Sequence, residues 1–118
     1  MGRKSLTKGK VGEREVASEL RRLFGVDARR GRQYSGGSDS PDVVADIPGI
    51  HLEVKRCERL SLYAAMRQSA SDAGTEKVPV VLHRQNREDW LVVVRLNDMP
   101  ELIDRFACLK DNEECMAE

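Results

Sequence analysis

The pattern of hydrophobic positions along the chain predicts amphipathic helices. In residues 12–24, apolar residues recur three and four positions apart, as on one face of a helix: Val16, Leu20, Leu23 and Phe24. A second stripe runs through residues 62–73 and stops at Gly74. Asn97 or Asp98 caps a third helix with Pro100 in its first turn. The side chains that this last helix turns inward are expected to be Leu102, Ile103 and Phe106.

Short apolar segments predict strands between these helices. The segments cover residues 26–30, 42–46, 50–56, 78–83 and 90–95. Pro48 and Gly49 form a turn signal, so the second and third segments are expected to pair as a hairpin. The apolar segments near Val80 and Val92 fit either the core or a dimer interface. This order of elements predicts an α/β sandwich around a central mixed sheet.

The strand predicted at residues 50–56 has two chemically different faces. Alternate side chains of a strand share a face, so Ile50, Leu52 and Val54 point one way. The opposite face then carries His51, Glu53 and Lys55. An apolar face can enter the core, whereas a carboxylate beside an ammonium is available for chemistry. A surface salt bridge between Glu53 and Lys55 is the simpler alternative.

Composition and length indicate one domain. The chain has 118 residues, 40% of them hydrophobic and 34% charged, as in a globular protein with a single modest core. We expect a flexible basic arm at residues 1–9, a single domain at 10–109 and a loose acidic tail at 110–118. The three cysteines show no Cys-x-x-Cys spacing. With no signal-like apolar region near the N-terminus, they indicate a reducing, cytoplasmic setting. Cys57 is interpreted as a small filler residue rather than a nucleophile.

Charge is unevenly distributed although the net charge is zero. Residues 1–34 contain ten basic and four acidic residues, whereas residues 97–118 contain two basic and seven acidic residues. A basic first third is typical of a phosphate-binding surface, and an ordinary solvated surface is the alternative. Gly36 and Gly37, in a loop by composition, would let the backbone approach such a ligand closely.

Two carboxylates at a suggestive spacing form a candidate metal site. Asp42 follows Pro41 and lies eleven residues before Glu53. Hard oxygen donors suit Mg²⁺, and Mn²⁺ can substitute for it. Lys55 would stabilise negative charge on a phosphate held beside such a metal. His51 shares the Glu53 face, and it either reaches this site or is a solvent-exposed polar residue.

These motifs together resemble the PD-(D/E)XK nuclease superfamily. Within it, the chain is similar to archaeal-type Holliday junction resolvases and to related small phage-encoded endonucleases. The resemblance covers about residues 8–75 and is weak beyond them. The segments that carry it are Lys8–Val16, Arg29–Arg30, Ser35–Gly37, Pro41–Ala45 and Leu52–Lys55.

The resemblance implies a restriction-endonuclease-like αβββαβ core and metal-dependent DNA cleavage, in a bacterial host if the chain is phage- or prophage-encoded. It implies that Glu13 joins Asp42 and Glu53 at the metal, although Glu13 could instead be an acid favoured by the helix dipole. It also implies that Arg14 and one of Arg29 or Arg30 contact DNA phosphate. Gln68 is either near the site, where it is expected to contact DNA, or a solvated helix residue. Resolvases act as dimers, so a homodimer is one option.

Three functional interpretations follow from these observations. The favoured one is an Mg²⁺-dependent DNA endonuclease, with branched DNA as the first substrate expected and linear, nicked or flap DNA as the second. The second interpretation is a nuclease-fold protein that binds nucleic acid without cutting it. The third is an interaction module whose basic arm binds an acidic partner, and it leaves the acids and Lys55 unexplained.

Overall fold

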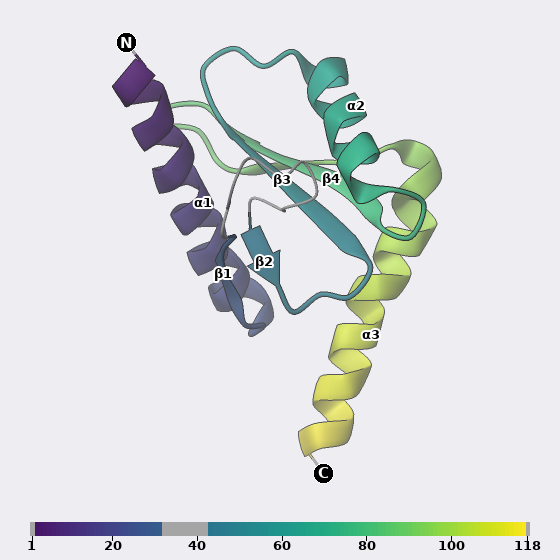
Figure 1. Ribbon diagram of the computed structural model, residues 1–118. Coiled ribbons are helices and arrows are strands. Elements are labelled where there is room, and N and C mark those ends of the chain that lie inside the picture. The colour runs from purple at the N-terminus through teal and green to yellow at the C-terminus, as the bar shows by residue number, and fades with distance from the viewer. Residues whose placement is uncertain (1, 32–42, 118) are drawn as a thin grey trace.

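The computed structural model describes residues 2–31 and 43–117 of the chain, with side chains placed for 10–29, 31 and 43–109. It contains helices on both sides of a mixed sheet (Figure 1). In chain order the elements are α1 (Gly2–Phe24), β1 (Ala28–Arg30), β2 (Val43–Ala45), β3 (Ile50–Arg56), α2 (Leu62–Ala73), β4 (Val78–Arg84), β5 (Leu91–Val93), η1 (Leu96–Asp98) and α3 (Met99–Ala117).

The strands form two sheets rather than one. β3, β4 and β5 make a sheet in that order, with β3 parallel to β4 and β4 antiparallel to β5. This mixed sheet flanked by helices confirms the predicted fold class. The predicted hairpin is wrong, because β2 pairs with β1 in a separate antiparallel ladder. The turn at Pro48 and Gly49 reverses the chain locally, but the backbone carbonyl of Gly49 accepts a 2.8 Å hydrogen bond from the amide of Val78. That bond aligns β3 with β4 instead.

The main core lies between α1 and one face of the β3–β4 pair. Leu52 and Val54 of β3 are buried in one cluster with Val16 and Leu20 of α1. The apolar set predicted for β3 therefore enters the core. Burial of each large apolar side chain contributes about 1.5–3 kcal/mol, which holds α1 against this face.

α2 covers the opposite face of the same pair (Figure 1). Val81 of β4 is completely buried against Ala65 and Met66 of α2. The Ser69 hydroxyl donates a 3.2 Å hydrogen bond to the backbone carbonyl of Val80, which anchors the helix over β4. The bounds of α2 agree with the sequence prediction, with Gly74 as its C-cap.

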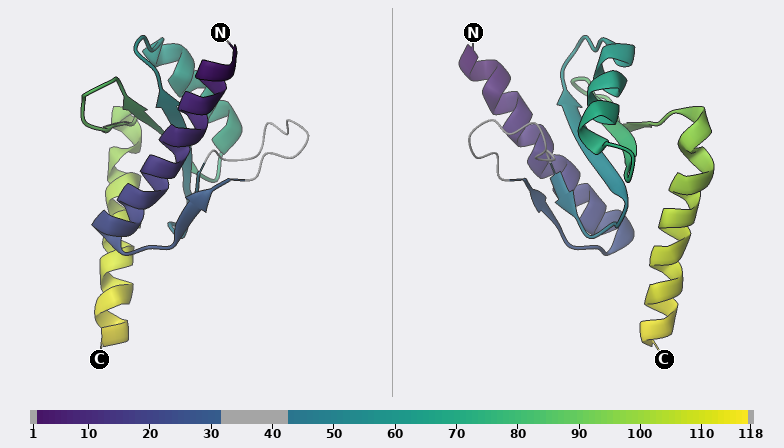
Figure 2. Two further views of the ribbon diagram at one scale, coloured as in Figure 1. Left: turned by 90° about the vertical axis from the view of Figure 1, so that its left-hand side faces the viewer. Right: turned by 45° about the vertical axis from the view of Figure 1, so that its right-hand side comes forward.

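Both terminal helices are longer than the sequence pattern predicts. α1 begins at Gly2, and α3 continues to Ala117 past the rest of the fold (Figure 2). No proline interrupts residues 2–24 or 101–117, so backbone hydrogen bonding continues beyond the amphipathic stripes. The proposed division into arm, domain and tail stays a prediction. None of the helices in the described part of the chain combines the length and apolar character that a membrane span needs.

The C-terminal predictions are confirmed only in part. Leu102 is buried and Phe106 packs on the main core, as expected, but Ile103 is 58% exposed and does not point inward. Val80 is a core residue, whereas Val92 on the edge strand β5 is 62% exposed. Among the described strands, β5 pairs with β4 alone, so few described neighbours cover its outer side.

Candidate active site

The face of β3 opposite the core presents a buried carboxylate beside a lysine. Glu53 is only 5% exposed. The Lys55 Nζ atom lies 3.8 Å from Glu53 Oε1, and the lysine side chain remains 30% exposed. A buried carboxylate is costly unless charged or hydrogen-bonding groups compensate it. The simpler alternative for this pair was a salt bridge on the protein surface. The burial of Glu53 does not fit that alternative.

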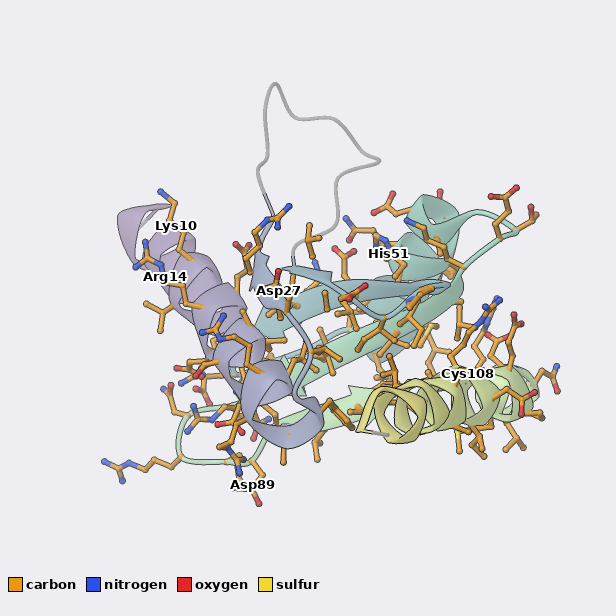
Figure 3. The ribbon with its side chains drawn as sticks, turned by 90° about the horizontal axis from the view of Figure 1, so that it is seen from below. Lys10, Arg14, Asp27, His51, Asp89 and Cys108 are labelled. Atoms are coloured by element: carbon orange, nitrogen blue, oxygen red, sulfur yellow. The ribbon has the colours of Figure 1, made fainter. Side chains whose placement is uncertain are left out.

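His51 is part of the same buried group. It is 2% exposed, so the second of its two alternatives, a solvent-exposed polar residue, is wrong. Its Nε2–H donates to Glu53 Oε2 across 3.2 Å. Figure 3 shows His51 on the side of the sheet toward α2 and away from α3. The two oxygens of Glu53 thus face different partners, Lys55 at Oε1 and His51 at Oε2.

α2 adds two side chains to this face. Gln68 Oε1 accepts a 3.4 Å hydrogen bond from Lys55 Nζ, so Gln68 contacts the lysine although it is exposed. Asp72 lies one helical turn further along α2. His51, Glu53 and Asp72 each offer one ligand atom, and these atoms lie within 4.8 Å of one another. Asp72 was not predicted from the sequence, although its position four residues after Gln68 places both on one helix face.

α1 approaches β3 closely at Gly12. A Cβ atom built on Gly12 would lie only 2.7 Å from the Cβ of Arg56, next to Lys55 in sequence. Glycine therefore lets the α1 backbone come close to the end of β3. Glu13 follows it directly and is half-buried. Glu13 lies outside the group formed by His51, Glu53 and Asp72.

The predicted DNA-contacting residues are distributed differently. Arg14 and Arg29 are exposed, and Arg14 projects from α1 beside Lys10 (Figure 3). Arg14 also lines an open groove of about 830 Å³ between α1 and the segment that links β4 to β5. In that groove Glu15 Oε2 accepts hydrogen bonds from Arg84 Nη1 at 2.7 Å and from Trp90 Nε1 at 3.2 Å. The groove wall is thus of mixed charge rather than purely basic.

Several predicted site residues lie outside the described part of the structure. These are Asp42, Gly36 and Gly37, together with the side chain of Arg30. Their roles stay predictions. Within the described part, the structure brings together Glu53, Lys55, Gln68 and His51 from the sequence prediction and adds Asp72.

The donor set suits a divalent cation. Two carboxylates and an imidazole converge from β3 and α2, and carboxylate oxygens and imidazole nitrogens are common ligands of divalent metals. An exposed ammonium lies at the edge of this group, where it can meet an anionic oxygen. A cation held by Glu53 together with Lys55 can bind a phosphate and stabilise the charge that develops as it reacts.

Comparisons with known proteins bear on the fold as a whole. Neither a protein-family model nor a curated protein matches the chain. Among solved structures, the fold is similar to that of a Holliday junction resolvase from the archaeal hyperthermophile Archaeoglobus fulgidus. The two are 25% identical, with a TM-score of 0.53 over 74% of this chain and 72% of that one. The resemblance to PD-(D/E)XK resolvases that the sequence motifs indicated is thereby confirmed.

Proposed function

We propose that this chain is a divalent-metal-dependent DNA endonuclease. The observation that carries the proposal is the buried Glu53 carboxylate next to Lys55, on a fold similar to that of a solved Holliday junction resolvase. A structural strand needs neither the buried charge nor the lysine beside it. Metal-assisted hydrolysis of a phosphodiester uses an acid that holds the metal, and a cation facing the phosphate stabilises the charge that develops.

The proposed metal ligands are Glu53, Asp42 and Glu13. These residues would hold Mg²⁺, with Mn²⁺ as a substitute, because both ions accept carboxylate oxygens. When bound, the cation lowers the pKa of a coordinated water and neutralises charge on the reacting phosphate. The role of Glu13 rests on the resemblance to the resolvases, because α1 packs on the core face of β3 and approaches that strand at Arg56 rather than at Glu53.

Lys55 is proposed to hold a non-bridging oxygen of the scissile phosphate. Its Nζ lies between Glu53 Oε1, at 3.8 Å, and Gln68 Oε1, at 3.4 Å. These two oxygens keep the ammonium on the reacting face before DNA binds, so little reorganisation is needed. Gln68 is thus a positioning residue for Lys55 rather than a group that touches the substrate.

DNA would bind along the basic first third of the chain. Arg14, Arg29 and Arg30 would contact backbone phosphates, which contribute affinity without sequence preference. The loop at Gly36 and Gly37 would approach the DNA. Branched DNA is the first substrate to test, because the similar solved structure is that of a Holliday junction resolvase. Linear, nicked and flap DNA are the second.

A homodimer and a cytoplasmic place of action complete the proposal. The edge strand β5 exposes Leu91 and Val92, and two copies would pair there through backbone groups that no other described strand bonds. A cytoplasmic setting fits Cys57 and Cys108, which are free thiols in the structure. A phage or prophage origin would place this activity in a bacterial host.

The alternative function is DNA binding without cleavage. It would use the same arginines and the same fold, and it would leave the buried Glu53 without a task. The two functions differ in a single measurement, the appearance of cut strands. They agree in predicting salt-dependent DNA binding, so binding alone does not separate them.

The experiment uses labelled four-way-junction, flap and linear DNA incubated with the full chain in Mg²⁺ or in EDTA. We expect strand cleavage in Mg²⁺ and none in EDTA. In Lys55→Ala the cleavage rate should fall about 10²–10³-fold, as when one group that stabilises an anionic transition state is removed. Lys77→Ala is the matched control, because Lys77 is exposed and precedes β4, at the other end of the strands from Lys55.

Cleavage that persists in EDTA or in Asp42→Asn would refute the metal mechanism. Binding of all three DNAs without cleavage in any divalent metal would favour the alternative. Paired symmetric nicks in the junction, with linear DNA left intact, would select a resolvase substrate.

A further inference from the structure

One feature of the site is not needed for the proposed hydrolysis. The expected metal ligands are all carboxylates, yet His51 is buried against Glu53 and Asp72 approaches both from α2. Among the described residues, neither His51 nor Asp72 forms a hydrogen bond or ion pair with Lys55. The pair therefore calls for an explanation of its own.

We infer that His51, Glu53 and Asp72 form a second cation site, which takes a transition-metal ion such as Mn²⁺ in preference to Mg²⁺. The three ligand atoms lie within 4.8 Å of one another, close enough for one ion to contact all three. They come from two rigid elements, since His51 and Glu53 share one face of β3 and Asp72 is on α2. Sites on rigid elements hold ligand geometry better than sites on loops.

The chemistry of the ligands decides the kind of ion. An imidazole nitrogen is a softer donor than a carboxylate oxygen and favours transition metals, whereas Mg²⁺ prefers oxygen ligands and water. Mn²⁺ accepts both donor types. As the side chains stand, His51 Nε2–H donates to Glu53 Oε2. A cation held by both atoms would take the place of that proton.

Glu53 links this site to the proposed catalytic centre. Its Oε2 faces His51, whereas its Oε1 faces Lys55. Glu53 can thus bind the second cation through Oε2 while Oε1 faces Lys55 and the proposed catalytic centre. If the proposed function holds, on which this step rests, the second cation orients Glu53 for catalysis. Binding of Mn²⁺ by His51 does not depend on cleavage.

The anchoring of α2 keeps Asp72 in place. Ser69 bonds to the carbonyl of Val80, and Ala65 and Met66 pack on Val81. Ala73, next to Asp72, is also buried. The helix therefore cannot easily move Asp72 away from His51, so the site is built before an ion arrives.

The test uses Mn²⁺ and pulsed electron paramagnetic resonance on the purified full chain. A nitrogen ligand modulates the Mn²⁺ spin echo, and the chain has two histidines. We expect nitrogen modulation in the wild type and in His83→Gln, and none in His51→Gln. His83 is the matched control, because its Nε2–H is engaged with the carbonyl oxygen of Cys57 at 2.9 Å.

Asp72→Asn provides a second variant, since it keeps the shape of the side chain and lies at a half-buried position. In this variant we expect the affinity of the site with the nitrogen ligand for Mn²⁺ to fall at least about 10- to 100-fold. That is the usual loss when a residue that only supports a metal ligand is replaced. Excess Mg²⁺ should not displace Mn²⁺ from this site, so the nitrogen modulation of the wild type should persist. If His51→Gln does not fold, the wild-type signal and Asp72→Asn still decide the question.

The possible results separate this site from the proposed function. Mn²⁺ that binds without nitrogen modulation in the wild type overturns the second site, as does modulation that persists in His51→Gln or disappears in His83→Gln. Cleavage of DNA in Mg²⁺ together with such a result would leave the endonuclease proposal intact. Nitrogen modulation in a protein that cuts no DNA would support the site and refute the endonuclease.

Discussion

Replacing Gly12 with alanine should separate the stability of the fold from the activity of the site. The new Cβ would lie 2.7 Å from Arg56 Cβ and 3.3 Å from Arg56 Cγ. Carbon atoms in good contact lie about 3.5–4.0 Å apart, so α1 must move away from β3 by about 1 Å. The atom it meets is attached to the strand backbone and cannot swing aside as the end of a flexible side chain could.

The two energetic effects on folding oppose each other. Overpacking a close contact costs about 1–3 kcal/mol, whereas alanine stabilises a helix interior by about 1 kcal/mol relative to glycine. The expected net loss is therefore about 0–2 kcal/mol in the free energy of unfolding. Activity should suffer more, because a shift of about 1 Å near the reacting groups can lower the rate on the order of a hundredfold.

The assay combines urea unfolding with the rate of DNA cleavage in Mg²⁺. Ser18→Ala is the matched control, since Ser18 is an exposed position of α1 where alanine gains helix propensity without a clash. Arg56→Gly in the Gly12→Ala background removes the two contacted carbons and should restore part of the lost rate. A Gly12→Ala protein that is about 1 kcal/mol more stable and fully active would refute the argument from close approach.

Three further predictions concern the fold and the assembly. Val81→Ala should lower the free energy of unfolding in urea by about 2 kcal/mol, because Val81 is fully buried beneath α2. Gly74→Ala should cost about 1–2 kcal/mol in the same measurement, because its φ of 70° disfavours a Cβ although no atom lies within 4 Å. Val92→Lys on β5 should leave unfolding unchanged and convert a homodimer to a monomer in light scattering, whereas a monomeric wild type would contradict the proposed dimer.

Local periodicity explains which features of the candidate site could be predicted. The alternation along β3 places Leu52 and Val54 in the core and Glu53 with Lys55 on the other face, because the two-residue repeat of a strand is independent of its partners. The bounds of α2 could also be predicted from the local sequence, since Gly74 ends the helix. The motif around these residues was enough to indicate a resolvase-like nuclease.

Other features depend on which elements meet in three dimensions. The partner of β3 is β4 and not the neighbouring β2, because the Gly49–Val78 hydrogen bond and the packing of α1 and α2 select it. His51 is buried on the face of β3 that Asp72 of α2 approaches.

The amino-acid sequence by itself determined the nuclease motif, the two faces of β3 and the uneven charge, since each is a matter of residue type and spacing. The tertiary structure decided that Asp72 approaches His51 and that Gly12 touches Arg56. Both contacts join residues from separate elements, so no local pattern could specify them. The physical reason is that packing, rather than periodicity, brings a helix to one particular place on a strand.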